Sequence, residues 1–264
     1  MIATLRNYVN TQLDASQKEW LIRLARKVFY VLKWPWRVCR GCTADLRMPL
    51  AARSWNSFIP MRMQFSLVNG TLRYTYRGIP AGVNPIDMAL YLKLLWDLKP
   101  LSIIEFGTKY GGTAVWFGDM MQLWQSPAQV VSIDIKGPWS TPWHLPFNVK
   151  FIQGDEGNLS PLKDMFAGLP HPWFIIDDAS HNAPTTLRGM QFLHQYLRRG
   201  DYMIIKDGWL AMVGEDGKDR QGGPTLAISR FLDEHGKEYE IDTKLCDFFG
   251  PNVTGNTNGY LRRL

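Results

Sequence analysis

Short apolar runs alternate with stretches of helical spacing along most of the chain after residue 84. The runs are rich in β-branched and aromatic residues, and each ends in a polar or charged residue, which is typical of strands buried on both faces of a sheet. The expected strands are 103–106, 130–134, 148–153, 173–177 and 202–206. Between them, apolar residues recur every three or four positions, which predicts helices over 85–98, 184–197 and 224–235.

This alternation predicts an α/β fold with a mainly parallel, doubly wound, Rossmann-like sheet. The tail adds apolar segments around Ile241, 245–249 and 260–261, which we expect to be closing strands. Before residue 84, several X-Pro pairs predict irregular chain, with a strand or a hairpin within 65–76 around the turn signal Asn69-Gly70. We therefore divide the chain into an N-terminal helical extension, residues 1–75, and an α/β domain, residues 76–264.

A glycine turn follows the strand at 103–106, and a helix is expected directly after it. Ligands of open α/β sheets bind where such strands end, and glycine lets the backbone approach them closely. An acidic residue closes the next strand, where it can accept both hydroxyls of a ribose, and another follows the third strand, placed to take an adenine amine. The candidate cofactor-binding residues are Glu105, Gly107, Thr108, Gly111, Gly112, Asp134 and Asp155.

The identity of the cofactor follows from the glycine spacing and from the charge of Glu105. The turn lacks the close Gly-x-Gly-x-x-Gly spacing that holds a pyrophosphate. Glu105 would repel a phosphate, but it can pair with the ammonium of a methionine. The pattern therefore favours S-adenosylmethionine (SAM) over NAD.

Composition and charge narrow the expected partners. The chain has 264 residues, of which 45% are apolar, enough for a packed domain with an appendage. Its net charge of +6 is concentrated between Lys18 and Arg40, and the remainder is nearly balanced, so no nucleic-acid partner is expected. The three cysteines suit a reducing compartment, and we expect a cytoplasmic protein.

Residues 16–40 have the pattern of a basic amphipathic helix with tryptophans near its end. Two interpretations are open. Such a helix can lie on a membrane surface, which would place the protein peripherally at the inner membrane face. It can equally pack on its own domain or on a second copy in a homo-oligomer. No stretch approaches the ~20 apolar residues of a membrane span.

Polar motifs follow the fourth and fifth expected strands, and together with the glycine turn they resemble a known family. The chain from about Gly78 to its end is similar to the cephalosporin hydroxylase/rhamnosyl O-methyltransferase family of class I SAM-dependent methyltransferases. The matching segments include Arg77-Gly78-Ile79-Pro80, the glycine turn, Ser132-Ile133-Asp134-Ile135, Gly154-Asp155, Asp178-Ala179-Ser180-His181, Lys206-Asp207-Gly208, Gly223-Pro224 and Gly259-Tyr260-Leu261-Arg262-Arg263.

The resemblance implies a seven-stranded sheet and O-methylation of a hydroxyl on a saccharide, a glycolipid or polysaccharide, or a natural-product scaffold. By the same resemblance, Asp178 and Asp207 match metal-ligand positions and His181 matches a general base. The chemistry agrees, because a neutral hydroxyl is a poor nucleophile and a base of near-neutral pKa helps to remove its proton. A hard cation such as Mg²⁺ would orient the same oxygen.

Lys206 departs from the family pattern, which usually has an acid at this position. Three interpretations are open: a cation binds weakly through Asp178 and Asp207, Lys206 supplies the positive charge itself, or Lys206 only forms an inert salt bridge. His181, Asp178 and Lys206 are therefore the candidate catalytic residues. Two alternative functions stay open at this point: a non-catalytic SAM-binding scaffold, and another nucleotide-cofactor enzyme such as an NAD-dependent oxidoreductase.

Overall fold

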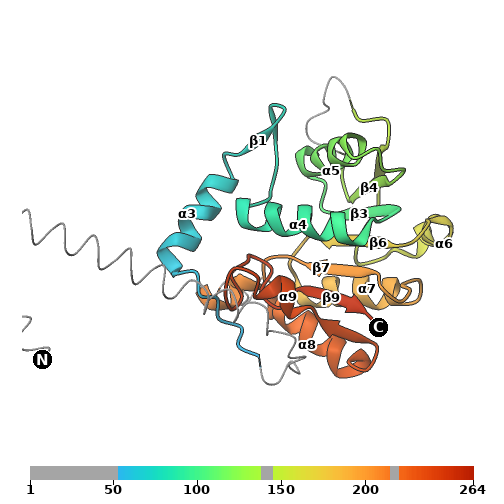
Figure 1. Ribbon diagram of the computed structural model, residues 1–264. Coiled ribbons are helices and arrows are strands. Elements are labelled where there is room, and N and C mark those ends of the chain that lie inside the picture. The colour runs from blue at the N-terminus through green and yellow to red at the C-terminus, as the bar shows by residue number, and fades with distance from the viewer. Residues whose placement is uncertain (1–52, 138–144, 215–219) are drawn as a thin grey trace, which may run out of the picture. The chain divides into compact units, whose positions relative to one another are not determined.

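The computed structural model describes residues 53–137, 145–214 and 220–264, which belong to one compact unit (Figure 1). The predicted amphipathic helix at 16–40 lies outside the described residues, so its two interpretations stay predictions. No helix in the described part of the chain is both long and apolar enough to cross a membrane.

A seven-stranded sheet forms the centre of this unit. Its strands are β3 (Ser102–Phe106), β4 (Gln129–Asp134), β5 (Val149–Gln153), β6 (Trp173–Asp177), β7 (Tyr202–Ile205), β8 (Tyr239–Ile241) and β9 (Tyr260–Arg263). They are arranged in the order β5-β4-β3-β6-β7-β9-β8. The first five are parallel, and β9 runs antiparallel to both of its neighbours. The predicted α/β class and the five parallel strands are confirmed.

The strand order reverses at β3, which lies between β4 and β6. The chain leaves β3 toward one edge of the sheet, through β4 and β5, and then returns to β6 on the other side. A reversal of this kind opens a crevice at the carboxyl ends of the central strands, where ligands of doubly wound sheets bind. The topology therefore places the glycine turn after β3 beside the segment that follows β6.

Helices cover both faces of the sheet: α4 (Pro85–Leu98), α5 (Gly112–Leu123), α6 (Lys163–Gly168), α7 (Ala183–His194) and α8 (Gly223–His235). In Figure 1 the green helices α4 and α5 lie on the opposite side of the sheet from the orange helix α8. The first of these helices begins where the Asn84 side chain accepts the N–H groups of Ile86 and Asp87, with Pro85 in the first turn. The predicted helices over 85–98, 184–197 and 224–235 are confirmed, within three residues at their ends.

Two neighbouring residues of β6 show how the core is divided between the faces. The ring of Phe174 contacts Tyr91 of α4 and Phe117 of α5. The ring of Trp173 points to the other face, since successive strand residues alternate, and contacts Phe166 of α6. All five side chains are at most 1% exposed, and burying each aromatic ring stabilises the fold by roughly 1.5–3 kcal/mol. The apolar strand residues thus fix the sheet between two helical layers.

Two predictions from the sequence are wrong. Residues 61–71 form the helix α3 (Met61–Thr71), so Asn69-Gly70 lies in the last turns of a helix and not in a turn beside a strand. Of the strand or hairpin expected within 65–76, a short strand at Thr75–Tyr76 does lie in that range. The hairpin lies further along, between β1 (Thr75–Tyr76) and β2 (Ile79–Pro80), where Arg77 and Gly78 both have positive φ. That conformation is the one a two-residue hairpin turn requires, and glycine adopts it without strain.

The second wrong prediction concerns 245–249, where we expected a strand. The short helix α9 (Thr243–Cys246) begins there instead, because the Asp242 side chain accepts the backbone N–H groups of Lys244 and Leu245.

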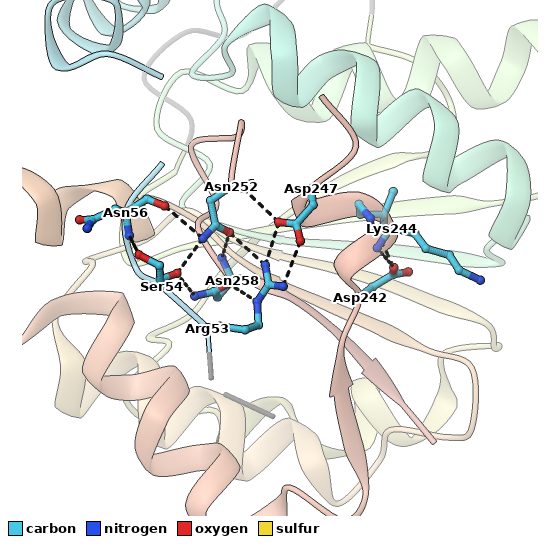
Figure 2. A network of polar contacts seen from close by, with 9 residues as sticks. Arg53, Ser54, Asn56, Asp242, Lys244, Asp247, Asn252 and Asn258 are labelled. Atoms are coloured by element: carbon cyan, nitrogen blue, oxygen red, sulfur yellow. Dashed lines mark hydrogen bonds and ion pairs between the residues drawn. The ribbon is translucent and has the colours of Figure 1, made fainter. Parts of the chain in front are cut away.

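A polar network joins the segment before α3 to the loop before β9 (Figure 2). The Arg53 guanidinium donates two hydrogen bonds to the Asp247 carboxylate, at 2.9 and 3.1 Å, and another to Asn258 at 2.6 Å. The Asn252 amide donates to the backbone carbonyl of Ser54 at 2.8 Å. Since the Arg53 side chain is only 4% exposed, this network fixes residues 53–56 to the folded unit.

Candidate functional site

A cavity of 490 Å³ lies at the carboxyl ends of β3, β6 and β7. The glycine turn forms one side of it through residues 107–110, and the segment 178–181 forms the other. Lys206 and Asp207, which follow β7, complete its polar lining, and residues of α3 form an apolar wall. The structure therefore brings Gly107, Thr108, Asp178, His181, Lys206 and Asp207 together, as the sequence predicted.

Glycine is required at two positions of the turn by close backbone contacts. At Gly107, whose φ is +90°, a Cβ atom would lie 2.1 Å from the carbonyl oxygen of Asp178. At Gly112, a Cβ atom would lie 2.3 Å from the carbonyl oxygen of Pro80. Gly111 has positive φ and is the N-cap of α5. The turn therefore lies close against the end of β6 and against β2.

Asp134 and Asp155 lie along the same edge of the sheet, but neither lines the cavity. The Asp134 carboxylate accepts the backbone N–H of Lys109 at 2.9 Å and that of Lys136 at 3.1 Å, which ties the end of β4 to the glycine turn. Asp155 is exposed and accepts the N–H of Gly157 at 2.8 Å within its own turn. The predicted roles of Asp134 and Asp155 in holding the cofactor therefore stay predictions.

Glu105 is buried beneath the glycine turn, with 1% of its surface exposed. Its carboxylate accepts a hydrogen bond from the Ser132 hydroxyl at 2.5 Å, and that hydroxyl is 2.6 Å from the hydroxyl of Thr108. Burial raises the pKa of Glu105 to about 8, although the bond from Ser132 opposes the shift. A cation bound beside this chain of hydroxyls would restore the ionised form.

His181 lies between two carboxylates. Its Nε2 atom is 3.1 Å from Oδ2 of Asp207 and 3.7 Å from Oδ1 of Asp178. His181 and Asp207 both have positive φ, at 52° and 58°, a conformation that costs a residue with a side chain ~1–3 kcal/mol. The fold thus holds both side chains toward the cavity at the expense of local backbone strain.

Lys206 is buried behind Asp178, and its ammonium is enclosed by oxygen atoms. Its Nζ atom donates to Oδ2 of Asp178 at 2.5 Å and to the carbonyl oxygen of Gly82 at 2.6 Å. Burial lowers the pKa of Lys206, but the carboxylates of Asp178 and Asp207 outweigh it, so that the pKa lies above the ordinary value. Burial raises the pKa of Asp178, and the Lys206 ammonium opposes that shift.

The residues around Asp178 fit a divalent cation poorly. Ligand atoms of Asp178, His181 and Asp207 lie within 4.8 Å of one another, which is close enough to share an ion. However, one oxygen of Asp178 already accepts from Lys206, which leaves a single free anionic oxygen on that carboxylate. A doubly charged ion roughly 4 Å from the ammonium would be repelled by ~8 kcal/mol at the effective dielectric of a partly buried site. The ammonium itself is the cation that this arrangement accommodates.

Several residues of the site were not predicted from the sequence. The α3 residues Gln64, Leu67 and Val68 line the cavity, as does Trp209. The buried Asp87 lies behind Lys206 and accepts hydrogen bonds from Thr254 and from the backbone N–H of Gly255 at 3.2 Å. The only sequence signal for these groups was the helix cap Asn84-Pro85, which indicated a helix start and nothing of the cavity.

The strand order and the site together define a class of protein. The sheet has seven strands and is mostly parallel, its C-terminal strand β9 is antiparallel, and a glycine turn follows its central strand β3. This arrangement is typical of class I methyltransferases. The solved structures of CmcI agree in fold. The apo form has a TM-score of 0.61 and 24% identity, covering 86% of this chain and 94% of that one. A form described as holding Mg and SAM has the same TM-score and identity and covers 95% of that chain.

Sequence comparison identifies the family. Residues 69–264 match the family model described as Rhamnosyl O-methyltransferase/CmcI. The rhamnosyl O-methyltransferase of Mycobacterium leprae is 31% identical over 196 residues, covering 72% of this chain and 82% of that protein. The one from Mycobacterium tuberculosis H37Rv is 30% identical over 194 residues, covering 72% and 78%. The chain therefore belongs to the rhamnosyl O-methyltransferase/CmcI family, and it is an O-methyltransferase.

Proposed function

We propose that this protein transfers the methyl group of SAM to a hydroxyl of a saccharide or of a natural-product scaffold, with His181 as the general base. The observation that carries the proposal is the position of the His181 imidazole, which lines the cavity opposite the glycine turn and faces two carboxylates. The names of the relatives support a sugar acceptor, and the SAM-bound form of CmcI supports the donor.

The residues on the β3 side fit SAM, which supplies a methyl group on a positively charged sulfur. Gly107 and Gly112 let the turn pack against the backbone of Asp178 and Pro80, and the backbone of residues 107–110 lines the cavity where the donor would bind. Beneath the turn, the carboxylate of Glu105 provides a negative charge that can attract the methionine ammonium. Hydrogen bonds through the hydroxyls of Ser132 and Thr108 link this carboxylate to the cavity. Asp134, at the end of β4, is the group that accepts hydrogen bonds from the ribose hydroxyls.

His181 takes the proton of the acceptor hydroxyl as the oxygen attacks the methyl carbon. The Asp207 carboxylate, 3.1 Å from Nε2, stabilises the imidazolium that forms, and Asp178 contributes at 3.7 Å. The proton leaves with water after the product dissociates. The remaining contribution of the site is to align the acceptor oxygen with the methyl group.

The lining of the cavity supports an acceptor with two kinds of surface. Polar groups lie on the side of His181, where the reacting hydroxyl belongs. Leu67 and Val68 of α3, with Leu72 directly after it, form an apolar wall. A deoxysugar, or a sugar on an apolar aglycone, presents hydroxyls on one part and apolar carbon on another. Its hydroxyls would bind near His181 and its apolar part against α3.

The proposal is tested by methyl transfer from isotopically labelled SAM to a panel of rhamnosides and other deoxysugar glycosides. The His181→Gln variant is expected to lose about 10²–10⁴-fold in kcat, with the affinity for S-adenosylhomocysteine unchanged. His235→Gln, on α8 and outside the cavity lining, is the control and should keep its kcat. If the His181→Gln variant is as active as the control, His181 is not the general base. Binding of S-adenosylhomocysteine with no transfer to any acceptor would favour the scaffold alternative.

A further inference from the structure

The Lys206 ammonium is held as a bound metal cation would be, by oxygen atoms from separate parts of the chain. Its Nζ atom donates to a carboxylate oxygen of Asp178 at 2.5 Å and to the backbone carbonyl of Gly82 at 2.6 Å. Carboxylate and carbonyl oxygens are also the ligands that hard divalent cations take in proteins. Only 5% of the surface of Lys206 is exposed, so these oxygen atoms take the place of water around its ammonium.

The Lys206 ammonium already balances part of the negative charge at this end of the cavity. Asp178 and Asp207 carry the negative charges that line the cavity, and one of these is neutralised directly by Lys206. The Asp87 carboxyl lies on the buried side of Lys206 and is bound by Thr254 and the backbone N–H of Gly255. A divalent ion on the free oxygen of Asp178 would therefore have to share that carboxylate with a buried, covalently tethered cation.

We propose that Lys206 is the resident cation of the acceptor site, and that this protein transfers methyl groups without a divalent metal ion. The inference rests on the proposed function. Lys206 acts as a positioning residue: it fixes the Asp178 carboxylate toward His181 and keeps positive charge beside the acceptor oxygen. In the reaction, the carbon–sulfur bond breaks, the carbon–oxygen bond forms and the hydroxyl proton moves to His181. Lys206 keeps its own proton throughout.

The first test needs no acceptor and uses Mn²⁺ alone as a probe, followed by electron paramagnetic resonance. The wild-type protein is expected to show no saturable binding up to millimolar Mn²⁺. The Lys206→Glu variant, which adds an anionic oxygen and removes the ammonium, should bind one equivalent. Stoichiometric binding of Mn²⁺ by the wild type at micromolar concentration would overturn the proposal.

The second test measures turnover in chelator and in Mg²⁺. Wild-type turnover should be the same in both, whereas Lys206→Met should lose about 100-fold in chelator and recover part of it in Mg²⁺. A lysine with only a structural role would give the same loss in both conditions, which would contradict the proposal. Lys93→Met, on the exposed face of α4, is the matched control and should behave as the wild type.

The two proposals fail in distinguishable ways. Wild-type turnover that disappears in chelator and returns with Mg²⁺ would refute the proposal that Lys206 replaces the metal ion. The proposed methyltransferase function would be unaffected by that result. If no methyl transfer is found at all, the Mn²⁺ titration of the wild type decides the present proposal alone. Circular dichroism of both Lys206 variants shows whether they fold. If neither does, the wild-type chelator and Mn²⁺ results decide.

Discussion

Replacing Glu105 by glutamine should make the ligand-free protein more stable, by an amount that grows with pH. Burial raises the pKa of Glu105 from its ordinary 4.5 to about 8 in the folded chain. The folded state therefore keeps a proton that the unfolded chain releases over this range. The stability of the wild type falls as pH rises from 4.5 to about 8, by ~5 kcal/mol from this residue alone. Glutamine is neutral in both states and avoids this loss.

The assay is urea unfolding of the wild type and of Glu105→Gln at about pH 5, 7 and 8, without ligand. The glutamine side chain keeps an oxygen to accept the hydrogen bond from Ser132. The difference in unfolding free energy should be below ~1 kcal/mol at pH 5, ~3 kcal/mol at pH 7 and ~5 kcal/mol at pH 8. Glu234→Gln, at an exposed position of α8, is the control and should follow the wild type. A difference that does not change with pH would refute the reasoning.

Two further predictions concern the cofactor side and the Arg53 network. Asp134→Ala should weaken binding of S-adenosylhomocysteine at least about 100-fold, because two charge-assisted hydrogen bonds to the ribose are lost; calorimetry showing unchanged affinity would contradict the assigned pocket. Arg53→Met should lower the free energy of unfolding by ~3 kcal/mol, measured in urea, because it leaves Asp247 without its cationic partner. Lys99→Met, which removes a cation from the C-cap of α4 instead, should change stability far less, and an equal loss in both variants would argue against a specific role of Arg53.

The sheet was predictable because its strands are buried on both faces. Runs such as Trp173–Asp177 have to be apolar throughout, and that signal is local in the sequence. Asp178, His181 and Asp207 were candidates because of the resemblance to the family. Their convergence was expected because the carboxyl ends of parallel strands meet at one edge.

The features that the sequence did not predict depend on competition between local signals or on distant contacts. At 61–71, the turn signal Asn69-Gly70 competes with helical spacing that begins directly after Pro60, and the helix prevails. The oxygen atoms that bind the Lys206 ammonium come from Asp178 and Gly82, 28 and 124 positions away in the chain, and no local pattern predicts such contacts. Lys206 could be recognised as a departure from the family, but its partners came only from the structure.

The wall formed by α3 has a consequence for how acceptor preference changes among related enzymes. Gln64 is the only residue of this helix that is buried, and most of the helix precedes residue 69, where the match to the family model begins. Substitutions on α3 would therefore reshape the cavity without disturbing the sheet or the reacting groups. On the proposed function, we expect libraries that randomise α3 alone to change which acceptors the enzyme takes while its reacting groups stay in place.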